Sequence, residues 1–124
     1  MAESGQERRQ FIRALFGHEK EISAVFATAL NPQKSIFVQV VNMSQGGVFF
    51  TYRSTRQLQL QQGDHIIFKE FRESDSPPFF IEIEAKIVWI IDEPAMEYTG
   101  VGSKFIQLSS ENLEKLEQFI LSFQ

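Results

Sequence analysis

The sequence predicts a mainly β fold: a six-stranded antiparallel β-barrel followed by one C-terminal α-helix. Apolar residues alternate with polar residues over most of the chain, which is typical of half-buried strands. The period changes to helical spacing only near the C-terminus. Strands do not alternate with helices as they do in parallel sheets, so a small barrel covered by the final helix is the expected architecture.

The first three strands are expected between residues 21 and 52. Asn31-Pro32 predicts the turn that ends the first strand. Residues 36–41 are rich in β-branched residues and apolar on both faces, which indicates a well-covered second strand. The polar stretch 42–47 interrupts this strand, and the third strand spans residues 48–52.

Three more strands are expected before the helix. The fourth spans residues 66–71 after a Gly63-Asp64 turn, and the sixth spans residues 99–106. The fifth is long, from residue 79 to residue 91, and follows the Ser/Pro-rich loop 74–78. It is expected to bury one face only, which consists of Ile81, Ile83, Ala85, Ile87 and Trp89.

A helix is predicted at the end of the chain. Either Ser109 or Ser110 can cap it, and Glu111 suits its positive N-terminal end. A single amphipathic helix cannot bury its apolar stripe alone, so it must pack on the sheet. The stripe consists of Leu113, Leu116, Phe119, Ile120 and Phe123.

Length and composition exclude several classes of protein. The 124 residues suffice for one domain, expected over residues 7–124 after a disordered tail at residues 1–6. The absence of cysteine excludes disulfides and zinc–thiolate sites. No apolar run could span a bilayer or serve as a signal peptide, so a cytoplasmic protein without membrane insertion is expected. The net charge of 12 − 16 = −4 argues against DNA or RNA as a partner.

The sequence offers no catalytic constellation. His18 and His65 are the only histidines and show no metal-ligand spacing. Ser44 lies in no nucleophile-elbow pattern. We therefore do not expect an enzyme, and we expect no cofactor.

Two polar segments remain unexplained by the fold. Arg8-Arg9-Gln10-Phe11-Ile12-Arg13 contains an Arg-x-x-x-Arg pair, and residues 42–47 form an Asn-x-Ser-x-x-Gly turn. Either segment alone is more often a solvated terminus or an ordinary turn.

The two segments, in this order, resemble the signature of the PilZ domain family. The Gly63-Asp64 turn, the long strand 83–89 and Gly102-Ser103-Lys104-Phe105 before the helix are also similar to that family, over about residues 7–123. The resemblance implies a receptor for cyclic di-GMP as ligand, with a downstream protein partner. The ligand-binding residues that it implies are Arg8, Arg9, Arg13, Asn42, Ser44, Gly46, Gly47 and Gly102.

The chemistry of these residues fits such a ligand. A guanidinium group can pair with phosphate oxygens, contact guanine O6 and N7 in a bidentate manner, and stack on a purine. Asn42 can accept and donate, and Ser44 offers a hydroxyl. Gly46 and Gly47 are expected to permit positive φ and close approach of a ligand.

Ordering of the N-terminal arginine arm on ligand binding is the expected mechanism. Arg8, beside the pair, suggests uptake of a stacked ligand dimer, although a solvated neighbour explains it equally well. The main alternative is a nucleotide-independent protein-interaction module of the same fold. A single-stranded nucleic-acid binder is a further alternative, against which the acidic charge argues.

Overall fold

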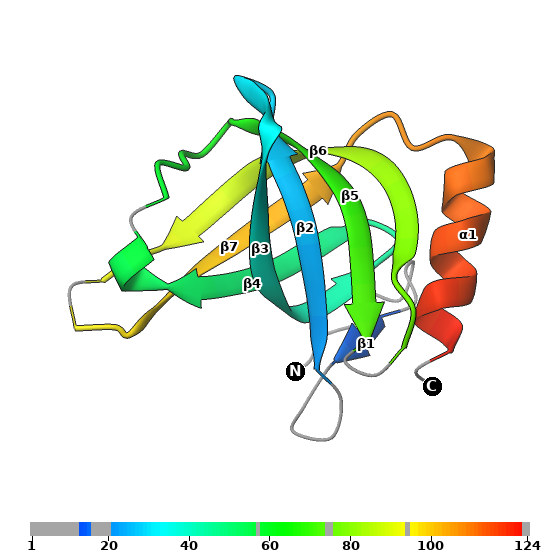
Figure 1. Cartoon of the computed structure of the whole chain (residues 1–124), viewed down its shortest axis with the longest axis horizontal. Coiled ribbons are helices and arrows are strands. Elements are labelled where there is room, and N and C mark those ends of the chain that lie inside the picture. The colour runs from blue at the N-terminus through cyan, green and yellow to red at the C-terminus, as the bar shows by residue number, and fades with distance from the viewer. Residues whose placement is uncertain (1–12, 16–20, 57, 74–75, 94, 123–124) are drawn as a thin grey trace, which may run out of the picture.

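The computed structural model describes residues 13–15, 21–56, 58–73, 76–93 and 95–122, the first of these ranges through its main chain (Figure 1). These residues form strands, a short 3-10 turn over Ser54–Arg56 and one helix. In chain order, the elements are β1 (Arg13–Leu15), β2 (Ile22–Thr28), β3 (Asn31–Ser44), β4 (Gly47–Arg53), β5 (His65–Glu73), β6 (Phe79–Ile91), β7 (Tyr98–Phe105) and α1 (Ser110–Leu121).

Six of the strands close into a barrel. In the order β3, β2, β5, β6, β7 and β4, each strand pairs with the next, and the pairing of β4 with β3 closes the circle. All of these pairings are antiparallel, so the predicted six-stranded antiparallel barrel is confirmed. β1 is an additional strand that the sequence did not predict. It pairs with the last residues of β3, beyond the point where the pairing with β2 ends.

Phenylalanine rings fill the centre of the barrel. Phe26 on β2, Phe50 on β4, and Phe68 and Phe71 on β5 are fully buried. The ring centroids of Phe26 and Phe50 are 5.2 Å apart, and those of Phe68 and Phe71 are 5.3 Å apart. Close ring pairs of this kind add to the stabilisation from buried apolar area. The core therefore accounts for much of the unusual phenylalanine content.

Two predicted turns lie elsewhere in the structure. The turn between β2 and β3 is at residues 29 and 30, so Asn31-Pro32 begins β3 and does not form the turn. The polar stretch 42–47 is not a break either, because β3 continues through Ser44 and turns only at Gln45 and Gly46. Asn42 and Ser44 are therefore strand residues with fixed register.

Two of the β-bulges in the barrel reverse the alternation of side chains beside the predicted binding residues. Val40 pairs with Phe50 and Asn42 with Phe49, so residue 41 is the extra residue in β3. Residue 88 is the extra residue in β6, between Ile87 and Trp89. An extra residue moves every later side chain of a strand to the opposite face. Trp89 is consequently 39% exposed, and its prediction as a core residue was wrong.

The C-terminal helix packs beside the barrel as predicted (Figure 1), but Leu113 of its predicted apolar stripe is exposed, and Phe123 lies outside the described residues. Leu116 and Ile120 are fully buried, and the ring of Phe119 stacks on Phe79 with 4.7 Å between centroids.

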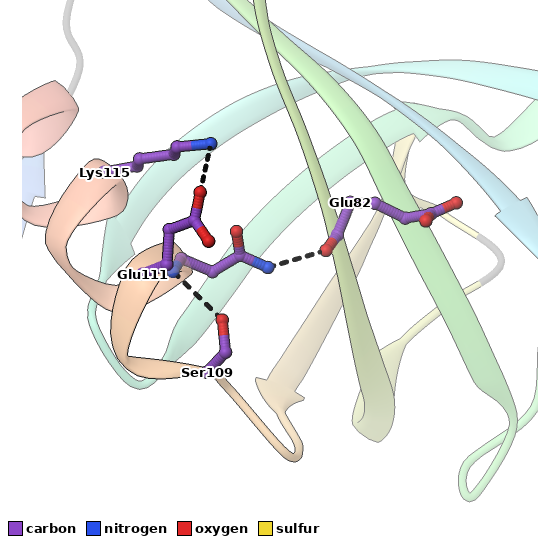
Figure 2. Close-up of polar contacts among 5 residues, drawn as sticks. Glu82, Ser109, Glu111 and Lys115 are labelled. Carbon is purple, nitrogen blue, oxygen red and sulfur yellow. Dashed lines mark hydrogen bonds and ion pairs between the residues drawn. The ribbon is translucent and has the colours of Figure 1, made fainter.

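Ser109 is the N-cap of α1, in agreement with one of the two predicted positions. Its Oγ accepts a hydrogen bond from the backbone N–H of Asn112 at 3.1 Å (Figure 2). The Asn112 amide in turn donates to the Glu82 carbonyl at 3.0 Å, which joins the first turn of the helix to β6.

Candidate ligand-binding site

A shallow hollow of about 410 Å³ lies on the outer face of the barrel, across β3, β4, β7 and β6. All the predicted binding residues with described side-chain positions line it: Asn42, Ser44, Gly46, Gly47 and Gly102. Its volume falls in the range of ordinary small-molecule sites. The fold therefore brings together residues that are 60 positions apart between Asn42 and Gly102.

The strand register builds the floor of this hollow. Asn42 pairs with Phe49, Phe49 with Gly102, and Gly102 with Trp89, so one row crosses four strands. The bulge at residue 41 directs Asn42 and Ser44 to the outer face of the strand and Met43 into the core, although Ser44 is itself only 7% exposed. The bulge at residue 88 does the same for Trp89. Without these two bulges, the polar motif and the indole would face the core.

Asn42 and Ser44 have different surroundings. The Oγ of Ser44 accepts a hydrogen bond from the Gly46 backbone N–H at 3.0 Å, which stabilises the tight turn after β3. Its hydroxyl hydrogen can still be donated. Asn42 is half-buried, and its side chain has no hydrogen-bond partner among the described residues. An amide can accept a hydrogen bond from a ligand and donate one to it.

Gly47 and Gly102 allow close packing within the protein, whereas the sequence led us to expect glycines here that permit positive φ and close approach of a ligand. A Cβ on Gly47 would lie 2.0 Å from the carbonyl oxygen of Ser103, so the missing side chain lets β4 approach β7 and is required by the fold itself. Its φ is not in the left-handed region. A Cβ on Gly102 would lie 2.2 Å from Cε2 of Trp89. Gly102 thus lets the indole lie on the strand.

Sequence reasoning missed the aromatic part of the hollow. The ring of Phe49 contacts that of Trp89, with centroids 5.0 Å apart and an angle of 52° between the planes. Together they present an apolar surface beside the polar side chains of β3. Flat purine bases stack on such aromatic surfaces. The Phe49-Phe50 pair hinted at an outward ring, because adjacent strand residues point to opposite faces.

The described residues include only the last residue of the arginine motif. Arg8 and Arg9 lie outside the described residues. Arg13 is the first residue of β1 and stands opposite Ser44 in the register of β1 and β3. Leu15 stands opposite Asn42 in the same way. The end of one motif is therefore paired through its main chain with the other motif, although the two are far apart in sequence.

Two further properties of the described part of the chain concern membrane-spanning helices and clusters of metal-ligating side chains. None of its helices is long and apolar enough to cross a membrane. His65 and the carboxylates of the same part form no cluster of three or more groups that could hold a metal ion.

Solved structures share this fold at low sequence identity. The motility inhibitor MotI/DgrA of Bacillus subtilis has a TM-score of 0.68 and 20% identity, over 93% of this chain and 50% of the other. The PilZ domain of Escherichia coli YcgR with c-di-GMP has a TM-score of 0.64 and 17% identity, over 94% of this chain and 91% of the domain. The MrkH–c-di-GMP complex of K. pneumonia has a TM-score of 0.66 and 14% identity, over 93% of this chain and 51% of the other.

The chain thus spans about half the length of two of these structures. A comparison with curated protein sequences finds no match. The model of the PilZ domain family matches residues 7–122. Since the match covers nearly the whole sequence and the barrel agrees with it, this chain belongs to the PilZ domain family.

Proposed function

We propose that this chain is a receptor for cyclic di-GMP and has no enzymatic activity. The observation that carries the proposal is the pairing of Arg13 with Ser44, at the edge of a hollow lined by Asn42 and Trp89. Family membership and the two solved complexes with c-di-GMP support the same ligand. The binding residues are Arg8, Arg9, Arg13, Asn42, Ser44, Gly46, Gly47 and Gly102.

The ligand groups match the groups around the hollow. Cyclic di-GMP carries phosphodiester anions and guanine bases, and arginine guanidinium groups bind both. The Asn42 amide can read the edge of a guanine, and the Ser44 hydroxyl can donate to a phosphate oxygen. A guanine plane can stack against Trp89 and Phe49, whose rings form the apolar part of the floor.

Calorimetric titration with cyclic di-GMP tests the proposal. Charge-assisted contacts contribute about 1.5–3 kcal/mol each, so Arg9→Ala and Arg13→Ala should each weaken binding by about ten- to a hundredfold. Arg72→Ala is the matched control, because Arg72 lies on β5 beside Glu70 and does not line the hollow. Failure of the wild-type chain to bind, or equal binding by all variants, would refute the assignment.

Trp89 gives a second readout of the same site. It is the only tryptophan in the chain, and it forms part of the floor of the hollow. Cyclic di-GMP should therefore change the intrinsic fluorescence, and Arg13→Ala should shift the titration midpoint in the same proportion as in calorimetry. An unchanged spectrum at saturating ligand would place the ligand elsewhere on the molecule.

The signal is proposed to pass through the N-terminal arm. Arg8 and Arg9 would close over the ligand from the strand that begins at Arg13, changing the surface that a downstream protein partner meets. The first ~15 residues should then gain protection from proteolysis when ligand is added. The stoichiometry measured by calorimetry decides whether the chain binds one ligand molecule or the stacked pair that Arg8 suggests.

A nucleotide-independent interaction module of the same fold is the second candidate. The position of two aromatic rings on the outside of the barrel favours it, because such surfaces also bind proteins. Binding of a protein partner with equal affinity in the presence and absence of cyclic di-GMP would support this candidate. The absence of DNA or RNA binding stays a prediction, which an oligonucleotide titration over a range of salt concentrations would test.

A further inference from the structure

One lysine outside the two sequence motifs lines the hollow, and a second lysine is paired with it on the next strand. Lys104 on β7 lines the hollow and pairs with Gly47 of β4 on one side. On the other side it pairs with Lys86 of β6. Both lysine side chains are exposed on the outer face of the barrel. Two lysines therefore stand on directly opposed residues, Lys104 in the lining of the hollow and Lys86 one strand beyond it.

This arrangement is unfavourable in the free protein. Opposed residues of an antiparallel pair have Cβ atoms about 4.5–5.5 Å apart, and like charges at such positions destabilise a sheet. Among the described residues, neither lysine has an ion-pair partner. Glu84 lies on the same face of β6, but its Oε2 is 2.8 Å from Nδ1 of His65. An anion from outside the chain would relieve the repulsion.

The lysine pair continues the row that begins at the arginine motif. Arg13 pairs with Ser44, Ser44 with Gly47, Gly47 with Lys104, and Lys104 with Lys86. Neighbouring strands are about 4.8 Å apart, so the row runs roughly 19 Å across the barrel. Three of its five positions carry a cationic residue, in a chain whose net charge is −4. The row therefore places three cationic residues in or beside the hollow.

We propose that Lys104 and Lys86 form an anion site that binds a phosphodiester group of the cyclic dinucleotide. The inference rests on the proposed function and deepens it, by adding two binding residues on β7 and β6. The phosphodiester can belong to the ligand molecule held by the arginines or to a second molecule stacked on it. Its chemistry at the lysines is the same in both cases.

The test is calorimetric titration of cyclic di-GMP into Lys104→Gln and Lys86→Gln. Each variant should bind about three- to tenfold more weakly than the wild-type chain, with a shallower dependence on salt concentration. Lys34→Gln is the control, because it removes the same charge from a different hollow, beside Leu30 and Asp64. It should bind like the wild-type chain.

The stability of the free protein separates a binding role from a structural one. Removal of either charge relieves the repulsion, so Lys104→Gln and Lys86→Gln should keep or raise the Tm without ligand. Lys104→Glu should raise it further, because it creates an opposite-charge pair with Lys86, and should weaken binding more than Lys104→Gln. A fall in both Tm and affinity in all three variants would overturn the anion site in favour of a structural role.

The outcomes also separate the two proposals. A drop in stoichiometry in the lysine variants would assign the phosphodiester to a second ligand molecule, and weaker binding at unchanged stoichiometry would assign it to the first. Wild-type affinity and salt dependence in both glutamine variants would overturn the anion site and leave the receptor function intact. Absence of binding by the wild-type chain would overturn the receptor function and the anion site with it.

Discussion

The contact between Gly102 and Trp89 supplies the sharpest test of how the hollow is built. In Gly102→Ala, the new Cβ would lie 2.2 Å from Cε2 and 2.3 Å from Nε1 of Trp89. Ordinary contact begins at 3.4 Å, so the ring must move by at least 1.2 Å. Because the indole is 39% exposed, it can swing outward without displacing the core.

The expected cost depends on the contacts that the ring loses. Outward movement separates Trp89 from Phe49, whose centroid is 5.0 Å away, and such aromatic pairs contribute about 0.5–1.5 kcal/mol. Overpacking a protein core costs up to about 3 kcal/mol of stability. Residual crowding against this exposed and flexible ring should cost less than that. We therefore expect Gly102→Ala to lower the free energy of unfolding by about 1–2 kcal/mol.

Urea denaturation followed by circular dichroism measures this cost. The fluorescence of the single tryptophan reports the movement of the ring, and its emission should shift to longer wavelength as the indole enters water. Gly100→Ala is the matched control on the same strand. Its Cβ would lie 3.0 Å from the Phe49 ring, which a small rotation can relieve. Equal stability and unchanged emission in Gly102→Ala and Gly100→Ala would refute the proposed packing of the indole on Gly102.

Two further predictions concern stability away from the hollow. Ser109→Ala should remove the N-cap of α1 and lower the free energy of unfolding by about 1 kcal/mol. Urea denaturation would detect this loss against Ser110→Ala as a control, since Ser110 is exposed and does not cap the helix. Burial, with a smaller contribution from the Asp92 carboxylate, raises the pKa of Tyr52 above its ordinary value of 10.0. The folded chain then keeps the phenol proton at a pH at which the unfolded chain releases it, so stability should fall as the pH rises above about 10. Tyr52→Phe should weaken this dependence; a slope equal to that of the wild-type chain would contradict the assignment.

The barrel could be predicted because its strands obey simple alternation over most of their length. Ile81, Ile83, Ala85 and Ile87 are all buried, as their spacing of two residues requires. The cap at Ser109 follows from equally local chemistry. These features depend only on neighbours in sequence. They are therefore visible without any knowledge of which strands pair.

The errors arise where tertiary pairing overrides local signals. Asn31-Pro32 is a strong turn signal, yet Asn31 pairs with Thr28 across a tighter turn and its N–H donates to the Thr28 hydroxyl. The polar residues 42–44 were predicted to end a strand, but β4 pairs with them on one edge of β3 and β1 on the other. The strand partners satisfy the backbone groups of these residues, so their polar side chains need not break the strand.

The candidate site depends most strongly on the features that the sequence does not display. Its motif residues could be named from sequence, but their orientation depends on residues 41 and 88, which have no polar signature of their own. Each bulge adds one residue to its strand beside a partner strand, β4 or β7, that has no extra residue. The side chains that follow the bulge in the same strand therefore point to the opposite face. The two bulges lie at the two edges of the same four-stranded row, so Asn42 from β3 and Trp89 from β6 both emerge on the outer face. A polar edge and an aromatic floor therefore meet at one hollow because of two separate departures from regular pairing.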